Sequence, residues 1–190
     1  MNKTSDFIIE NGILKAYNGD EKVVCVPDGV VCIGGIILKE EIDKEYLRAS
    51  AFEYAYKAFY CNKTIEEVVL PDSVTAIGFK SFLCCENLKT MTFSANLKKI
   101  ECCALTNCIN LKIIIFKGSI YEFCLLDVES HNGLDLDEVI CSDGTIKFHR
   151  EHYIDELHFP GTREEWNFMC ERGNTGWLKR RAKKVICTDD

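Results

Sequence analysis

The sequence predicts an α/β repeat protein in which short strands and their connections stack coil upon coil into a solenoid. Three segments carry this signal, because each has large apolar residues at its first, fourth and sixth positions. They are residues 65–70, 88–93 and 111–116, and each begins 23 residues after the one before. The spacing continues outside these segments, since Ile77 and Ile100 also match.

Side-chain alternation explains how one repeat works. Within residues 88–93, Leu88, Met91 and Phe93 point inward, whereas the two threonines between them point outward. One coil cannot shield its own apolar face, so several coils must stack to bury a continuous core. Each inward side chain contributes about 1.5–3 kcal/mol when it is fully buried. The period and the apolar core together predict a short leucine-rich-repeat solenoid.

The turn before each strand carries a second repeated position. Asn62, Cys85 and Cys108 occupy it in successive repeats. A small buried polar group at this place can bond loop backbone that would otherwise lack a partner. Because Asn and Cys interchange here, a structural role explains the position better than a disulfide or a metal does.

The segments 58–61, 65–74 and 77–78 resemble the BspA-like leucine-rich repeats, also called Treponema pallidum-type repeats. The resemblance covers about residues 20–116, and two later positions depart from it. Ser94 stands where proline is usual and Glu101 where glycine is usual, so we expect looser turns there. The resemblance implies a fold rather than a ligand. It also implies proteins that are often surface-attached or secreted in host-associated bacteria and are thought to serve adhesion or host interaction.

Local sequence patterns predict the first two regions of the chain. Residues 1–19 form an N-terminal β-hairpin cap, because Asn11-Gly12 between two apolar runs favours a two-residue type I′ turn. Residues 20–116 hold the leucine-rich repeats, and residues 39–60 form an inserted helix because their apolar residues recur at helical spacing. The aromatic residues of this helix either pack on the convex side of the solenoid or form a partner-binding patch.

Residues 117–190 form the third region, with duplicated strand–helix–strand repeats. Residues 111–119 match residues 154–162, 43 positions later, and helix-like segments follow both copies. Thr162 and Glu165 resemble a capping box that opens the second helix. Phe123 and Trp166 occupy equivalent places in the two copies, and we expect both to anchor the core.

Charge and hydropathy exclude some classes of protein. The formal net charge is −7 and the isoelectric point is near 5.2, which argues against a nucleic-acid partner. No stretch approaches 18 apolar residues, so we expect no membrane span. The first six residues lack the features of a secretory signal, which favours a cytoplasmic location for the chain as given.

The twelve cysteines are expected to be reduced thiols. Five at repeat or strand positions are interpreted as small buried apolar residues: Cys25, Cys85, Cys108, Cys141 and Cys187. The adjacent pairs at 84–85 and 102–103 are expected to point in different directions, so neither suits a shared metal. His149 and His152 with Cys141 form the best metal constellation, but a fourth ligand and a matching spacing are lacking. We therefore expect no metal and no cofactor.

The common catalytic motifs are missing from the sequence, including phosphate-binding loops, the nucleophile elbow and the H-E-x-x-H zinc motif. We therefore predict that the chain is not an enzyme. The enzymatic alternative is a thiol-dependent activity, which would need an exposed and activated cysteine. Cys124 or Cys170, on the predicted C-terminal helices, would carry it.

The outward strand face is the best candidate for function. Its side chains do not point to the core, and two of them, Ile113 and Ile115, are apolar, so they are either covered by neighbouring chain or part of an interaction surface. We predict a non-enzymatic module that binds a protein or glycan; an intracellular scaffold or a fragment of a larger surface protein is the alternative. The oligomeric state does not follow from the sequence. The candidate binding residues are Glu67, Val69, Thr90, Thr92, Ile113 and Ile115.

Overall fold

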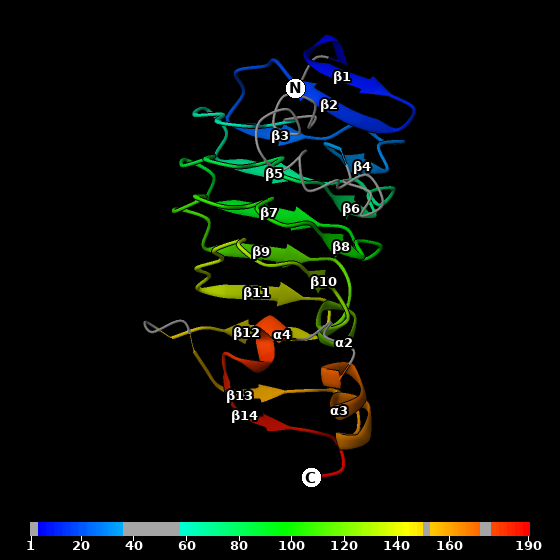
Figure 1. Cartoon of the computed structure of the whole chain (residues 1–190), viewed down its shortest axis with the longest axis vertical. Coiled ribbons are helices and arrows are strands. Elements are labelled where there is room, and N and C mark those ends of the chain that lie inside the picture. Colours follow the sequence, from blue (N-terminus) through cyan, green and yellow to red (C-terminus); the bar gives the residue numbers. More distant parts are fainter. Residues whose placement is uncertain (1–3, 36–57, 150–152, 172–175) are drawn as a thin grey trace, which may run out of the picture.

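The structure is a computed structural model that describes residues 4–35, 58–149, 153–171 and 176–190. The coils of the chain pile up along one long axis, with the two ends of the chain at opposite ends of the stack (Figure 1). Strands form two columns along this axis, and short helices lie near the C-terminal end. The repeat solenoid predicted from the sequence is therefore confirmed.

The first column is the main sheet, to which each coil gives its longer strand. Its first five strands are parallel neighbours, and the last strand turns back antiparallel. In spatial order they are β3 (Val23–Cys25), β5 (Glu67–Val69), β7 (Thr90–Phe93), β9 (Ile113–Phe116), β11 (Glu138–Cys141) and β12 (Gly144–Lys147).

The second column is the second sheet, made largely of two-residue strands. After a 3₁₀ turn at Thr4–Asp6 it runs, in spatial order, through β1 (Phe7–Glu10), β2 (Ile13–Tyr17), β4 (Cys32–Ile33), β6 (Ala76–Ile77), β8 (Lys99–Ile100) and β10 (Asp127–Val128). A separate parallel pair follows, β13 (Ile154–His158) with β14 (Ala182–Ile186). The helices are α2 (Ile120–Cys124), α3 (Arg163–Glu171) and α4 (Gly176–Lys179).

Strand register places one inward row through the main sheet. Val24 pairs with Val68, which pairs with Met91, and Met91 pairs with Ile114. Each of these four side chains is at most 1% exposed. The row confirms the predicted inward positions, and it shows that the 23-residue spacing brings equivalent residues side by side.

The repeated turn position works as predicted. Asn62 Oδ1 accepts hydrogen bonds from the backbone N–H groups of Thr64 and Ile65, at 2.8 and 3.0 Å. Cys85 Sγ donates to the carbonyl oxygen of residue 59 at 3.0 Å, and Cys108 Sγ donates to that of residue 82 at 3.1 Å. Amide oxygen and thiol therefore perform the same task, which is to satisfy buried backbone.

The two departures from the family pattern do not loosen their turns, contrary to the sequence-based expectation. Ser94 is fully buried; its Oγ donates to Val74 O at 2.9 Å and accepts from Asn96 N at 3.0 Å. Glu101 is 3% exposed, and its Oε1 lies 3.2 Å from Lys99 Nζ. Serine and glutamate thus add side-chain contacts that proline and glycine could not make.

The predicted N-terminal hairpin is present. Strands β1 and β2 pair antiparallel, and both residues of their connection have positive φ, 51° at Asn11 and 76° at Gly12. This is the conformation of a type I′ turn. Because β2 pairs with β4, the hairpin covers the end of the second sheet, and the main sheet begins separately at β3.

The predicted inserted helix lies largely outside the described residues. Its last part, residues 58–60, is a turn rather than a helix, and Phe59 is buried there against Phe82, with 4.7 Å between ring centroids. On either side of the insertion, β3 and β5 are hydrogen-bonded directly to each other. No main-sheet strand therefore lies between these two.

The C-terminal part contains two strand–helix–strand units of the same design. Helix α2 joins β9 to β11, and α3 lies between β13 and β14. Both helices open with a reciprocal capping box, Ser119 with Glu122 and Thr162 with Glu165. The expected core anchors are confirmed at 1% exposure for Phe123 and 4% for Trp166.

Candidate functional site

The six predicted binding residues lie on the face of the main sheet that is turned away from the core. Register arranges them in two outward rows of three: Glu67, Thr90 and Ile113 in one, and Val69, Thr92 and Ile115 in the other. All six are half-buried, whereas the residues between them are buried. The strands therefore bring the six together on one continuous surface, which we call the outward face.

The outward face is wider than the sequence indicated. Ile140 continues the Ile115 row on β11 and is 36% exposed, and Cys25 continues it on β3. Val23, 49% exposed, continues the other row. In the described part of the chain, nothing buries Ile113 or Ile115 completely. The result is a largely apolar strip across five strands, interrupted on β7 by Thr90 and Thr92.

Ion pairs border the outward face on the side where the chain enters the strands. Glu66 accepts from Lys22 Nζ at 2.6 Å and from Lys89 Nζ at 2.5 Å, which links three successive coils. Lys112 and Asp135 form a similar pair at 2.5 Å. Hydrogen bonds from Lys22 and Lys89 lower the pKa of the Glu66 carboxyl to about 2. An apolar strip with a charged border is the surface pattern of an interface.

The Glu66 ion pairs give a pH-dependent contribution to stability. Because the folded-state pKa is depressed, this contribution is present above the ordinary pKa of 4.5 and is lost as pH falls towards about 2. We expect the melting temperatures of wild type and Glu66→Gln to differ at neutral pH and to converge over that range. Added salt should shrink the difference, since the lysines are exposed. A carboxyl that titrates in its ordinary range by NMR would contradict this assignment.

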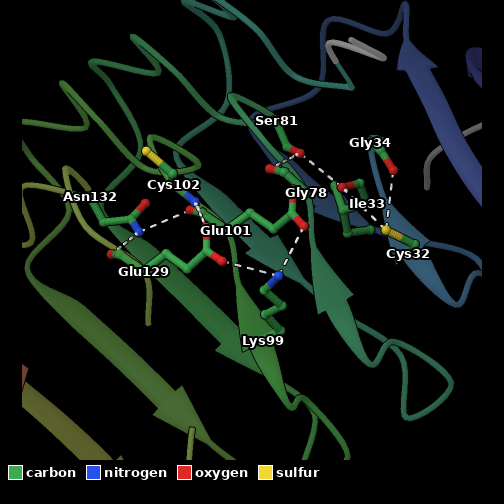
Figure 2. A network of polar contacts seen from close by, with 10 residues as sticks. All are labelled: Cys32, Ile33, Gly34, Gly78, Ser81, Lys99, Glu101, Cys102, Glu129 and Asn132. Carbon is green, nitrogen blue, oxygen red and sulfur yellow. Dashed lines mark hydrogen bonds and ion pairs between the residues drawn. The ribbon is translucent and has the colours of Figure 1, made fainter. Parts of the chain in front are cut away.

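A buried polar network lies at the end of the second-sheet strands (Figure 2). Gly78 approaches Gly35 so closely that an added Cβ would lie 2.3 Å from the Gly35 oxygen. One repeat later, Glu101 takes the equivalent position, and Lys99 Nζ bridges it to Glu129 Oε1 at 3.2 and 3.1 Å. One lysine thus serves two carboxylates, Glu101 and Glu129, and this fixed ion-pair arrangement suits a structural role better than acid–base chemistry.

The thiols do not form a reactive centre on Cys124. This thiol is buried, and burial raises its pKa to about 12, so it is protonated and shielded at neutral pH. Cys170 is half-buried on α3. The interpretation of Cys25 as a buried residue is wrong, because Val24 takes the inward place and alternation turns Cys25 outward. The other four cysteines interpreted as buried are confirmed: Cys85, Cys108, Cys141 and Cys187.

Alkylation of the native protein should follow exposure. We expect iodoacetamide to modify Cys25 and Cys61 first, because both are exposed, and to reach Cys85 and Cys124 only after unfolding. Peptide mass spectrometry at several times after mixing measures this order. Rapid labelling of Cys124 in the folded protein would contradict the structure and restore the thiol-dependent alternative.

The suggested histidine site is not assembled by the described residues. His149 Nε2 lies 3.0 Å from Asp155 Oδ2, Cys141 is buried, and His152 lies outside the described residues. His158 on β13 is exposed. A metal-like grouping does occur at the C-terminal end, where ligand atoms of Cys187, Asp189 and Asp190 fall within 4.8 Å of one another.

That C-terminal grouping already has a cation. Arg163 pairs with Asp190 through its guanidinium group, and its backbone N–H donates to Asp189 Oδ1 at 2.8 Å. The N–H of Cys187 donates to Asp190 Oδ2 at 2.8 Å. These contacts link the start of α3 to the last turn of the chain, so the two carboxylates stabilise the fold of the C-terminal end.

A cavity of about 400 Å³ lies between the turn after β10 and the residues around α4. Its lining has mixed charge, with Asp127 and Glu129 on one side and Arg180 and Arg181 on the other. Trp177 Nε1 and Arg181 Nη1 have no hydrogen-bond acceptor, but both atoms are closed off from solvent. Ser130 and His131 also line the cavity, and Ser130 Oγ lies 2.8 Å from His131 Nδ1.

The parallel coils, their one strand per sheet and the repeated turn hydrogen bonds define a leucine-rich-repeat protein. The chain belongs to the BspA-type leucine-rich repeat family, whose sequence pattern matches residues 52–167 in six copies. A search of curated proteins found no match. Within the described ranges, no helix has both the length and the apolar character to cross a membrane.

Two solved structures are similar to the chain. A leucine-rich-repeat protein of T. pallidum is 19% identical, with a TM-score of 0.48 and coverage of 98% of this chain and 83% of that one. A leucine-rich cell surface protein of Faecalibacterium prausnitzii is 17% identical, with a TM-score of 0.40 and coverage of 94% and 48%. The chain thus spans about half the length of the second protein.

Proposed function

We propose that the chain is a non-enzymatic binding module that takes a protein or glycan partner on the outward face of the main sheet. The observation that carries this proposal is the alignment of half-buried apolar side chains across successive coils, with ion pairs along one border. Repeat proteins of this kind use such extended surfaces for binding.

The chemistry of the outward face favours a protein partner over a glycan partner. It is apolar at Val69, Ile115 and Ile140, on either side of β7, and residues of this kind are more common in the core of protein interfaces than charged residues are. The two threonines, Thr90 and Thr92, add hydroxyl groups that can bond either a peptide or a sugar. Among the described strands, the outward face carries no aromatic residue that would single out a glycan.

Affinity capture with two isoleucine-to-glutamate variants tests this proposal. Ile115→Glu places a charge in the apolar strip and should abolish retention of the partner, whereas Ile109→Glu should leave it unchanged. Ile109 is the matched control because it is 61% exposed on a turn away from this face. Melting temperatures of both variants should stay close to wild type, which separates lost binding from lost folding.

Two treatments of the lysate distinguish a protein partner from a glycan partner. Protease treatment of the lysate should remove the captured partner if it is a protein, and periodate oxidation should remove it if it is a glycan. Equal recovery of the same partner by wild type and Ile115→Glu would show that the outward face is not the site.

Adhesion or host interaction, implied by the family resemblance, is the biological setting we propose for this binding. The alternative is an intracellular scaffold. Fractionation of cells that carry the native protein distinguishes them, because an adhesin must reach the surface and a scaffold must not.

A further inference from the structure

Two adjacent cysteines, Cys102 and Cys103, bring their sulfur atoms together at one corner of the second sheet. They follow β8, and their Sγ atoms lie 3.4 Å apart. Both thiols are half-buried, and neither is part of a disulfide. Sulfur atoms at this distance are in direct contact, so the pair is suited to chemistry that needs two thiols at once.

The expectation that Cys102 and Cys103 point in different directions is wrong, because it assumed an extended backbone. Successive side chains alternate along a strand, but Cys103 has φ of 58°, which is in the left-handed region. Alternation therefore does not hold at this pair, and both sulfur atoms lie on the same side of the chain.

Hydrogen bonds to the next coil hold both cysteines in place. Cys102 N donates to Glu129 Oε2 at 3.0 Å (Figure 2), and Cys103 N donates to Ser130 O at 3.3 Å. The other carboxylate oxygen of Glu129 lies 3.1 Å from Lys99 Nζ. The contact between the two sulfur atoms therefore belongs to the folded chain, and unfolding removes the bonds that maintain it.

A disulfide between neighbours in the chain is strained. The two sulfur atoms must approach by about 1.4 Å to reach the S–S bond length of about 2.05 Å. The Cα atoms of consecutive residues are about 3.8 Å apart, below the range of about 4.4–6.8 Å that is usual for disulfide-bonded residues. Strained disulfides are the ones that are easily reduced. A bond between Cys102 and Cys103 would therefore open again under mild reduction.

We propose that Cys102 and Cys103 form a reversible disulfide when the protein meets a low-molecular-weight disulfide such as oxidised glutathione. One cysteine thiolate attacks a sulfur atom of the oxidant, so that a mixed disulfide forms and one glutathione thiolate leaves. The second cysteine then attacks the protein sulfur atom of the mixed disulfide and displaces the other glutathione. The cysteines lose two electrons, the oxidant gains them, and the two thiol protons end on the two glutathione molecules released.

The surroundings of Cys102 control the speed of this reaction. Burial and the Cys103 thiol raise the pKa of the Cys102 thiol to about 11; the Glu129 carboxylate also raises it, and Ser130 lowers it. The other titratable group beside this thiol is His131, whose Nδ1 lies 3.8 Å from Cys102 Sγ. Because the thiolate is the nucleophile, oxidation should be slow at neutral pH and faster as the pH is raised towards about 10.

The test incubates the full, previously reduced chain with oxidised glutathione, blocks the remaining thiols with N-ethylmaleimide and maps the peptides by mass spectrometry. The peptide with Cys102 and Cys103 should lose two hydrogen atoms and carry neither glutathione nor maleimide. Cys61 should carry glutathione, because this thiol is exposed, and it thereby shows that the oxidant reacts. Excess reduced glutathione should restore both thiols of the pair.

Cys84 and Cys85 are the matched internal control, because they are also adjacent but their sulfur atoms have separate partners. Cys85 Sγ donates to Phe59 O at 3.0 Å, and Cys84 Sγ accepts from Asn107 Nδ2 at 3.6 Å. In the folded chain this pair should not form a disulfide. In urea the difference between the two adjacent pairs should disappear, because unfolding removes the contacts that distinguish them.

Variants with a single thiol separate disulfide formation from simple oxidation. In Cys102→Ser or Cys103→Ser the remaining cysteine has no partner and should keep glutathione as a mixed disulfide. Equal melting temperatures of the reduced proteins show that the variants fold. The proposal would be overturned if Cys102 and Cys103 of the wild type kept their thiols or bound glutathione after Cys61 had reacted. It would also be overturned if both adjacent pairs formed disulfides equally in the folded chain. Neither result depends on the proposed binding role of the outward face.

Discussion

Replacement of Phe82 by alanine is expected to lower the free energy of unfolding by about 3–5 kcal/mol. Phe82 is fully buried and stacks on Phe59, which contacts Tyr17, which in turn contacts Phe7. The substitution therefore opens a cavity at the repeat end of an aromatic column that joins the hairpin to the repeats. Urea denaturation followed by circular dichroism measures the change.

Phe168→Ala is the matched control for this substitution. Phe168 is 53% exposed on α3, so its loss should change stability by no more than about 0.5 kcal/mol. Similar losses in the two variants would mean that Phe82 does not lie in a packed column, and the stacking of the coils would have to be reconsidered.

Replacement of Asn132 by leucine should also lower the free energy of unfolding, by about 3 kcal/mol, because it removes three hydrogen bonds to buried backbone. Asn132 is 4% exposed; its Nδ2 donates to Glu101 O and Glu129 O, at 3.0 and 2.9 Å, and its Oδ1 accepts from Leu105 N at 2.9 Å. Leucine has the same branched skeleton but satisfies none of these groups. Denaturant unfolding again provides the measurement.

Asn110→Leu is the comparison for Asn132, because Asn110 is exposed and donates a single 2.7 Å bond to Glu86 O. We expect a loss below about 1 kcal/mol there, since water can replace an exposed hydrogen bond. A loss at Asn132 no larger than at Asn110 would show that buried backbone near β8 is satisfied in another way.

The stack itself could be predicted because its signal is periodic. Inward positions such as Met91 and Ile114 recur every 23 residues, and alternation then assigns Thr90 and Thr92 to the opposite face. The hairpin was also predictable, since Asn11 and Gly12 are the residues that tolerate positive φ. These features depend only on local sequence.

Features that depend on contacts between coils could not be predicted in the same way. Asn132 follows Cys108 by 24 residues, so the strict period passes over it, although it bonds backbone as Cys85 does. Ile140 was missed as part of the outward face because β11 lies outside that period. Cys102 Sγ lies 3.8 Å from His131 Nδ1, and this approach depends on the pairing of β8 with β10.

The candidate site was predicted as a set of outward residues but not as a surface. Alternation identified the face, and the structure adds its extent on β3 and β11 and its border of ion pairs. A partner is recognised by the shape and charge of the whole surface, and these arise only when the coils are stacked. One repeat considered alone cannot reveal them.

The antiparallel strand β12 has a mechanical consequence. Among the described strands, it is the last in the main sheet, and β13 and β14 form a separate two-stranded sheet. The terminal pair is joined to the stack largely by side chains, such as Tyr121 against Phe159 at 5.5 Å between ring centroids. Under tension along the long axis, we therefore expect the contacts at the junction between β12 and β13 to break first. The repeats before this junction would stay folded while β13 and β14 separate from the stack.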